Sequence, residues 1–280
     1  YESTMTDSRL NTLRNWLKGL EPSWQLDLPT LAPASADASF RRYFRIASKN
    51  PDFPTLIVMD APPQHEPLDS FIQVDLLLES AGLNVPKILE KNVAEGFLLL
   101  NDLGTKTYLA ELNSESADYL YKDATHALVQ MQLASKADVL PNYDEALLKR
   151  ELDLFPEWYL GKHLHIELSK LQNLQIKQAF ELIIQNNLTQ AKVYVHRDYH
   201  SRNLMVTEKN NPGVIDFQDA VYGPITYDAS SLWRDAYISW PEERVIDWVI
   251  KFWEEGRQVG LPMPNDFGQF YRDFEWMGLQ

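Results

Sequence analysis

The chain has 280 residues, of which 45% are hydrophobic and 12% aromatic, and its 40 acidic and 26 basic residues give a formal net charge of −14. This composition predicts a folded core of one large domain or two lobes, and the acidity argues against nucleic-acid binding, which needs a basic face. The absence of cysteine excludes disulfides, thiolate metal sites and a thiol nucleophile. No apolar run approaches the ~20 residues that span a bilayer, and the polar N-terminus lacks a signal-peptide core. We therefore expect a cytoplasmic protein with no membrane partner.

The first hundred residues combine helices with strands. A helix is predicted over Asp7–Leu20, where apolar residues recur on one face. SADAS is predicted to be a loop of small residues. Two strands are predicted after it, Phe40–Ala47 and Thr55–Asp60, joined by a turn that contains Pro and Asn. A second helix is expected over about Leu68–Ala81.

A change of pattern occurs at the apolar strand FLLL (97–100), which stops at the turn-prone NDLG (101–104). The remainder is mainly helical, with apolar residues at three- and four-residue spacing over Asp118–Leu133, Asp144–Leu160 and Ser169–Gln190. The shift predicts an α+β fold with two lobes. These are a small β-rich N-terminal lobe (1–100), a hinge (101–104) and a larger helical C-terminal lobe (105–280). Clefts between lobes are preferred ligand sites.

Charged and amide side chains are dense in VYVHRDYHSRNLMV, between two expected short strands. The following stretch, NLMVTEKNNPGVIDFQD, has two apolar runs around TEKNNP, which predicts a hairpin. If Thr207 faces Pro212, antiparallel counting places Asn203 opposite Asp216. An amide and a carboxylate brought together in this way suit Mg²⁺.

Asp198 precedes Asn203 by five residues, which matches the phosphoryl-transfer pattern of a catalytic-loop Asp, an Asn and a later metal-binding Asp. Asp198 could accept a proton from an incoming hydroxyl, while Asn203 and Asp216 hold Mg²⁺ with ATP. His196, two residues before Asp198, is expected to be a buried support of the loop. The alternative from another class is a zinc hydrolase that uses His196, Asp198 and His200.

These motifs resemble those of the aminoglycoside phosphotransferase family, which has a protein-kinase-like fold. The stretches SADASFRRYFRI, VMDAPP, FLLLNDLG, ELDLFPEWYLG, VHRDYHSRNLM and IDFQDAVYGPITYD are similar to bacterial anomeric N-acetylmuramate/N-acetylglucosamine kinases of cell-wall recycling. The resemblance covers nearly the whole chain and implies transfer of the ATP γ-phosphate to the C1 hydroxyl of the amino sugar. Members of that group continue by several helices, so we expect the C-terminal end of this chain to be incomplete.

The resemblance also implies roles for residues whose function the local sequence pattern does not decide. Asn101, Asp102 and Leu103 would present a hinge backbone to the adenine edge, although the pattern alone is that of an ordinary turn. Ser39 would lie in the phosphate loop, although SADAS is not rich in glycine. Asp228 is either the N-cap of a following helix or a brace beneath the catalytic loop, and both roles are compatible.

The nucleotide lobe departs from the wider family at the lysine of the third strand. The matching position in LIVMDAPP is Asp60. Counting across a hairpin that pairs Ala47 with Thr55 places Asp60 opposite Arg42, with Arg41 adjacent. We expect Asp60 to orient one of these arginines towards the ATP phosphates. The alternatives are arginines that only decorate an exposed strand, or a pseudokinase that binds without turnover.

Candidates for the acceptor site lie in ALLKRELDLFPEWYLG and SSLWRDAYISW, which mix polar and aromatic residues. We assign Arg150, Glu151 and Arg234 to the sugar acceptor, and a lactyl carboxylate would favour an arginine. Asp219 is either a surface carboxylate or a further acceptor residue beside the metal. Most of the aromatics nearby are expected to belong to the core. The alternative acceptors are an aminoglycoside, a choline-like molecule or another hydroxylated small molecule, and a cationic substrate would explain the acidity more directly.

Overall fold

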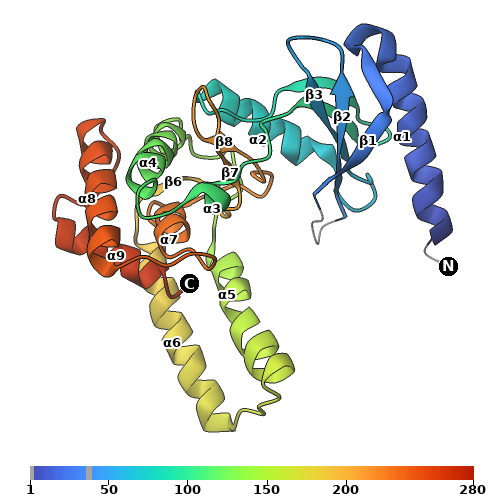
Figure 1. The fold of residues 1–280 in the computed structure, drawn as a ribbon. Helices are drawn as coiled ribbons and strands as arrows, with labels where there is room; N and C mark the ends of the chain where they lie inside the picture. Colours follow the sequence, from blue (N-terminus) through green and yellow to red (C-terminus); the bar gives the residue numbers. More distant parts are fainter. Residues whose placement is uncertain (1–2, 36–39) are drawn as a thin grey trace. The chain divides into compact units, whose positions relative to one another are not determined.

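The computed structural model describes residues 3–35 and 40–280, and the chain divides into two compact units. The first comprises Tyr1–Leu77 and Val85–Thr105, and the second comprises Leu78–Asn84 and Lys106–Gln280 (Figure 1). The segment 78–84 therefore groups with the second unit. Within the described residues, no helix has both the length and the apolarity required to cross a membrane.

The first unit contains an antiparallel five-stranded sheet in the order β1-β2-β3-β5-β4. Its strands are β1 (Leu26–Ser35), β2 (Arg42–Ser48), β3 (Thr55–Asp60), β4 (Ile88–Asn92) and β5 (Phe97–Asn101). The register pairs Ala47 with Thr55 and Arg42 with Asp60, which confirms the count made from the sequence. Strand β1 was not predicted, because Pro29 and Pro33 argue against a strand. They are tolerated here because β1 is an edge strand.

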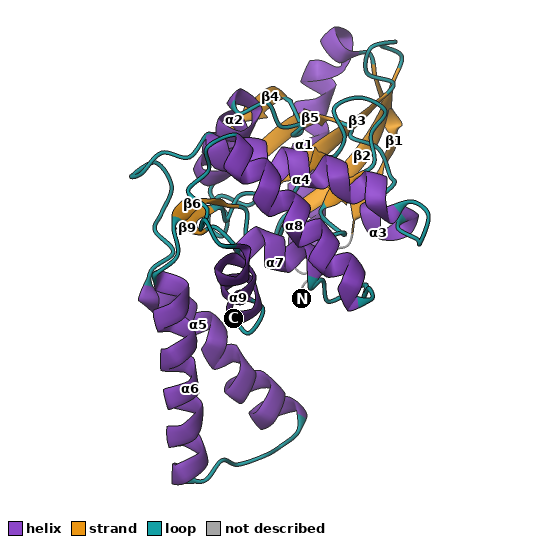
Figure 2. Ribbon diagram, turned by 90° about the vertical axis from the view of Figure 1, so that its left-hand side faces the viewer, coloured by secondary structure: helices purple, strands orange, loops and turns teal. Residues whose placement is uncertain are grey.

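Helices α1 (Ser3–Trp24) and α2 (Leu68–Ser80) lie on opposite sides of this sheet (Figures 1 and 2). Leu13 and Leu17 of α1 are fully buried in a cluster with alternate residues of three strands. These residues are Phe44, Ile46, Leu56, Val58, Phe97 and Leu99, and Leu26 of β1 also belongs to the cluster. Residues of the other parity, such as Met59 and Leu98, are also fully buried. Both faces of the central strands are therefore covered.

The second unit is mainly helical. Its helices are α3 (Tyr108–Glu111), α4 (Ala117–Leu133), α5 (Glu145–Leu154), the π-helix η1 (Phe155–His163), α6 (Lys170–Leu188), α7 (Tyr227–Trp233), α8 (Glu242–Gln258) and α9 (Phe267–Met277). The predicted helix Asp144–Leu160 changes to π-helix at Phe155. Pro156 is the physical reason we infer, because it has no backbone N–H to continue the α-helical pattern.

Two short antiparallel pairs of strands flank the loop that follows β6. Strand β6 (Lys192–Val195) pairs with β9 (Val221–Pro224), and β7 (Leu204–Met205) pairs with β8 (Gly213–Val214). The loop between β6 and β7 contains the polar cluster singled out in the sequence. Its two ends are therefore fixed by two different strand pairs.

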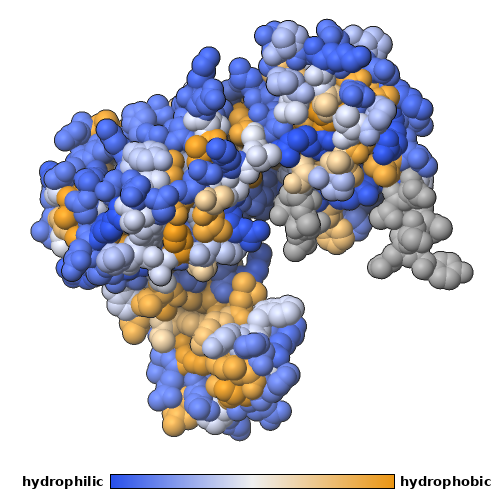
Figure 3. Space-filling view, viewed as in Figure 1, coloured by the Kyte–Doolittle hydropathy of each residue, from blue (hydrophilic) through white to orange (hydrophobic). Residues whose placement is uncertain are grey.

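A hairpin of α5, η1 and α6 extends from the rest of the second unit (Figures 1 and 2). Hydrophobic residues are visible over this part of the surface in Figure 3. The large apolar side chains exposed there include Phe155, Trp158, Tyr159, Leu171, Leu174 and Leu182. Trp158, expected to belong to the core, is 54% exposed, whereas Trp233 on α7 is buried as expected.

Candidate active site

The start of the polar loop is fixed by a buried carboxylate on α7. Asp228 accepts hydrogen bonds from the backbone N–H groups of His196 (2.7 Å) and Arg197 (3.0 Å). It lies in the first turn of α7, but the N-cap residue is Thr226, so the N-cap alternative for Asp228 is wrong. Complete burial raises the pKa of Asp228 to about 7, although both backbone hydrogen bonds oppose this shift.

His196 is fully buried beneath the loop, and both of its ring nitrogens have backbone partners. Its Nδ1 accepts from the N–H of Asp198 (3.2 Å), so the proton is on Nε2, which donates to the carbonyl oxygen of Ile215 (3.0 Å). Burial lowers the pKa of His196 to about 4, so the ring is neutral near pH 7. Neither nitrogen is available to a metal ion, which disagrees with the zinc-hydrolase alternative.

Arg197 was not singled out in the sequence, although the structure makes it central to the loop. Its backbone is left-handed, with φ of 78°, and its guanidinium donates to Glu151 on α5 (2.6 Å). Tyr143 also donates a hydrogen bond to Glu151. Burial opposes the charge of Arg197, but the Glu151 carboxylate outweighs it and raises the arginine pKa. Glu151, assigned to the acceptor, therefore contacts the polar loop.

The register of the β7–β8 hairpin differs by one residue from the expected one. The backbone N–H of Ile215 donates to the carbonyl oxygen of Asn203 (3.1 Å), so Ile215 is opposite Asn203. The turn is closed by the side chain of Asn211, which accepts from the N–H of Thr207 (3.1 Å). Pairing Thr207 with Pro212 neglected the capacity of an Asn side chain to close a turn.

Asp216 nevertheless comes next to Asn203, because its backbone is left-handed, with φ of 63°. The Asn203 Nδ2 lies 3.4 Å from Asp216 Oδ2 and donates to the carbonyl oxygen of Asp198 (3.0 Å). Gln218 Nε2 donates to the other Asp216 oxygen (2.7 Å). The structure therefore brings Asp198, Asn203 and Asp216 together. The cause is the left-handed backbone of Asp216 and not the strand register that was counted from the sequence.

The Asp198 carboxylate is partly buried at the centre of this group. Burial raises its pKa, and the negative charges of Asp216 and Asp219 act in the same direction. Among the described residues, no hydrogen bond to its side-chain oxygens is found. A carboxylate of raised basicity without an internal partner is suited to receive a proton from a bound hydroxyl.

A second carboxylate fixes the other half of the loop. Asp235, just after α7, accepts from the backbone N–H of Ser201 (3.0 Å) and from its hydroxyl. The other Asp235 oxygen accepts from the N–H of Tyr237 (2.9 Å). Asp228 and Asp235 thus hold the two halves of the loop from opposite ends of one short helix.

In the first unit, the expected contact between Asp60 and Arg42 is present, but Asp60 has a second arginine partner. Its buried carboxylate accepts from Arg42 Nε (2.9 Å) and from Arg9 Nε of α1 (2.6 Å). Arg9 also donates to the carbonyl oxygen of Glu95 (2.6 Å). Strand alternation places Asp60 with Val58 on the α1 side of the sheet. Arg9 is 51 positions from Asp60, and no local pattern pointed to it.

Arg41 makes a different ion pair. Its Nε lies 2.6 Å from Glu66 Oε2, in the segment that precedes α2. The neighbouring Phe40 and His65 rings are stacked, with their centroids 4.5 Å apart. Two consecutive residues before β2 therefore meet two consecutive residues before α2. Ser39 lies outside the described residues.

The comparisons with known proteins agree with this geometry. Residues 30–262 match the sequence model of the phosphotransferase enzyme family. The chain belongs to this family. Three relatives are each named N-acetylmuramate/N-acetylglucosamine kinase, and the predicted family is thereby confirmed. They come from Pseudomonas aeruginosa (45% identity, 98% of this chain and 82% of the relative), Pseudomonas putida (44%, 98% and 82%) and Neisseria meningitidis (45%, 96% and 79%).

Solved structures that are similar to this phosphotransferase confirm the predicted kinase-like fold. The ADP-bound aminoglycoside phosphotransferase APH(2'')-Ib has a TM-score of 0.62 at 15% identity, over 94% of this chain and 96% of that one. An ethanolamine kinase of Plasmodium vivax has a TM-score of 0.62 at 10% identity, over 90% and 73%. At these identities the likeness concerns the fold alone.

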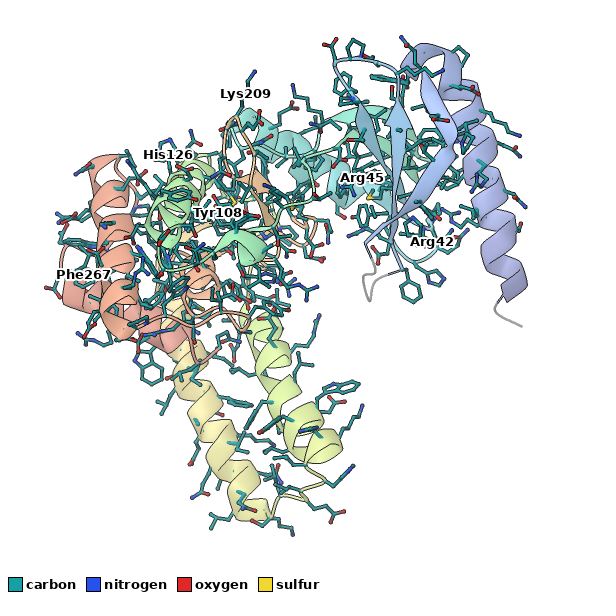
Figure 4. The ribbon with its side chains drawn as sticks, viewed as in Figure 1. Arg42, Arg45, Tyr108, His126, Lys209 and Phe267 are labelled. Atoms are coloured by element: carbon teal, nitrogen blue, oxygen red, sulfur yellow. The ribbon has the colours of Figure 1, made fainter. Side chains whose placement is uncertain are left out.

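The segment 101–104 of the phosphotransferase, the predicted hinge, is held by side chains of its own unit. Arg45 of β2 donates to Asp102 (Nε, 2.6 Å) and to the carbonyl oxygen of Gly104 (3.1 Å), and Asn101 Oδ1 accepts from the N–H of Lys87 (2.5 Å). Burial would raise the pKa of Asp102, but the hydrogen bond from Arg45 lowers it below its usual value. Figure 4 labels Arg45 and Arg42, which both belong to β2.

The remaining acceptor candidates of the phosphotransferase are dispersed. Arg150 is exposed, and no ion pair or hydrogen bond to its side chain is found within the described parts of the chain. Asp219 is exposed and close enough to influence the pKa of Asp198. Arg234 binds Glu242 (2.7 and 2.8 Å) and Glu275, so its guanidinium already links α7 to α8 and α9.

Proposed function

We propose that this phosphotransferase is an ATP- and Mg²⁺-dependent kinase that phosphorylates the anomeric C1 hydroxyl of N-acetylmuramate and N-acetylglucosamine in peptidoglycan recycling. The observation that carries the proposal is the contact of Asn203 with both Asp198 and Asp216 in a chain whose relatives bear this kinase name. A cytoplasmic location belongs to the same proposal, because the ATP of the cell is there.

Asp198 is the proposed catalytic residue. It orients the acceptor hydroxyl and accepts its proton as the oxygen attacks the γ-phosphorus. Its pKa is raised, so the carboxylate is a stronger base than an ordinary aspartate. His196 and Asp228 contribute by fixing the backbone on which Asp198 stands. No covalent intermediate with the protein is required.

Asn203 and Asp216 are the residues that would hold Mg²⁺. Nδ2 of Asn203 is directed at the carbonyl oxygen of Asp198, and no hydrogen bond to its Oδ1 is found among the described residues. Asp216 is exposed and supplies a full negative charge. This amide and carboxylate pair fits a hard cation that takes few protein ligands and several phosphate or water oxygens. Mg²⁺ bound there neutralises charge on the phosphates.

The first unit is proposed to bind the nucleotide through the hinge, with Ser39, Arg41, Arg42 and Asp60 as the phosphate-side candidates. No backbone hydrogen bond of Leu103 is found within the described residues, whereas the Asp102 side chain is engaged by Arg45. The backbone of Leu103 is therefore suited to pair with the edge of adenine.

For the acceptor we propose Arg150 and Asp219 as residues that face the sugar. Glu151 and Arg234 remain part of the proposal as residues near the acceptor, although each already has a charged partner in its unit. An exposed arginine is suited to the carboxylate of a lactyl group, because its planar guanidinium can make paired hydrogen bonds.

The test is product identification after incubation with ATP, Mg²⁺ and a panel of N-acetylmuramate, N-acetylglucosamine, an aminoglycoside and choline. We expect a C1-phosphorylated amino sugar. Asp198→Asn should reduce transfer by ~10²–10⁴ while MgATP binding persists, since general-base losses have this size. The matched control is Asp247→Asn, an exposed aspartate on α8. Phosphorylation of another panel member alone, or near-normal transfer by Asp198→Asn, would contradict the proposal.

A further inference from the structure

A phosphate-binding cation is missing from the strand where kinase-like folds normally carry it. In protein kinases, a lysine of the third strand binds the α- and β-phosphates and pairs with an acid of the helix that follows. In this chain the helix that follows β3 is α2. The side chain near the end of β3 that points to the α2 side of the sheet is Met59, which has no charge.

The arginine paired with Asp60 lies on the other side of the sheet. Arg42 is opposite Asp60 in the register, and its guanidinium lies 5.6 Å from the ring centre of Phe44, a member of the cluster that packs against α1. Asp60 itself contacts Arg9 of α1. Arg9, Arg42 and Asp60 therefore tie α1 to the sheet on the side away from α2.

We propose that Arg41, positioned by Glu66, is the phosphate-binding cation of this phosphotransferase and replaces the strand lysine. The inference rests on the proposed use of ATP. It selects Arg41 over Arg42 and adds Glu66 as a positioning residue. The pair reproduces the kinase arrangement of a cation held by an acid from the α2 side, with both residues moved along the chain.

The contacts at Arg41 are those of a guanidinium held in place. The Arg41 and Glu66 side chains are only 10% and 17% exposed, so their ion pair is shielded from solvent. The stacking of Phe40 on His65 fixes the adjacent residues in the same relation. Together these contacts anchor the chain just before β2 to the segment that leads into α2.

The chemistry of a guanidinium suits a phosphate as well as a carboxylate. The group carries five N–H donors in a planar fork. The fork also matches the spacing of two phosphate oxygens, which an ammonium does not. Glu66 thus limits the motion of Arg41, while the arginine retains the geometry for a nucleotide.

Nucleotide binding tests this assignment without relying on turnover. Affinities for MgATP and for adenosine, which has no phosphates, are measured by calorimetry or ligand competition. The proteins are wild type, Arg41→Ala, Arg41→Lys, Glu66→Gln and the Arg41→Ala/Glu66→Gln double variant. Arg41→Ala should weaken MgATP by about 10- to 100-fold, the size of a lost charge-assisted hydrogen bond, with adenosine unchanged. Arg41→Lys should recover part of the loss, and Glu66→Gln should add little in the Arg41→Ala background.

Arg9→Ala is the matched control, because it removes an arginine on the opposite side of the sheet that has no proposed part in binding. It should lower stability but leave the ratio of MgATP to adenosine affinity within about three-fold of wild type, less than one charged contact. Arg42→Ala, measured in the same way, tests the competing candidate. A loss of this ratio in Arg42→Ala but not in the Arg41 or Glu66 variants would overturn the inference. Failure of wild type to bind MgATP would instead refute the proposed function. Thermal unfolding of each variant separates loss of binding from loss of fold, and Arg41→Lys serves where Arg41→Ala does not fold.

Discussion

Arg197 shows how much of the proposed catalytic loop depends on single residues. A left-handed backbone in a residue other than glycine costs about 1–3 kcal/mol and persists only where neighbouring contacts impose it. Here two contacts do so, since Asp228 accepts from the Arg197 N–H and Glu151 binds its guanidinium. The position of Asp198, the next residue, follows from these contacts.

Asp228→Asn tests this dependence at the residue scale. A carboxylate accepts from the N–H groups of both His196 and Arg197, whereas an amide offers one oxygen and sets its own N–H₂ against the second donor. Leaving that donor unsatisfied costs about 1–3 kcal/mol, so we expect kcat to fall by roughly 10-fold or more. Steady-state kinetics should show little change in KM for ATP. A normal kcat would contradict the role of Asp228.

At the scale of elements, the sequence and the structure agree where the information is local. The β2–β3 register followed from apolar runs on both sides of a turn, and α4 and α6 followed from helical spacing. The β7–β8 register did not, because Asn211 closes that turn through its side chain. Strand β1 was missed since its prolines are acceptable only at a sheet edge, which sequence does not identify.

The attachment of α1 to the sheet is testable by a mutant cycle. Asp60 is completely buried, whereas Arg9 and Arg42 are 22% and 32% exposed. Asp60→Ala should therefore destabilise more than either arginine substitution. The loss should approach ~3–5 kcal/mol, as for a broken buried ion pair, but less if the arginines reach solvent. Once Asp60 is removed, Arg9→Ala should cost little more, because the two act together.

Urea unfolding measures each member of this cycle, and Lys18→Ala supplies a matched control on the exposed side of the same helix. Lys18→Ala should change the unfolding free energy by less than about 0.5 kcal/mol. Additive losses in the Arg9→Ala and Asp60→Ala double variant would show that Asp60 does not link α1 to β3.

For the whole molecule, the family could be predicted from short motifs, but the network around the site could not. The spacing of Asp198 and Asn203 lies within one loop. In contrast, the pairs Arg197–Glu151 and Arg9–Asp60 join residues 46 and 51 positions apart. Such pairs depend on how helices pack, and a single sequence contains no local periodicity that specifies them. For the same reason, the sequence did not decide whether Arg41 or Arg42 is the arginine directed towards the phosphates.

Two buried groups of the second unit should give the stability of the molecule opposing dependences on pH. Burial lowers the pKa of His196 from 6.5 to about 4, so between these values the unfolded chain binds a proton that the folded chain does not. Stability contributed by neutral His196 is therefore lost as pH falls through this window. Burial raises the pKa of Asp228 from 3.8 to about 7, so its effect has the opposite sign.

The comparison of wild type with His196→Gln isolates the contribution of His196 to the pH dependence of stability. Glutamine can donate to Ile215 and accept from the N–H of Asp198, as the neutral ring does, but it does not titrate. Linkage predicts that between pH 7 and pH 5 wild type loses about 2 kcal/mol through His196, and the variant loses none of it. The stability deficit of the variant, measured by urea unfolding at pH 5, 6 and 7, should shrink by that amount towards pH 5, while Asp228 acts equally in both proteins. A deficit that is constant across this range would mean that His196 titrates alike in the folded and unfolded chains, and would contradict the effect assigned here to its complete burial beneath the polar loop.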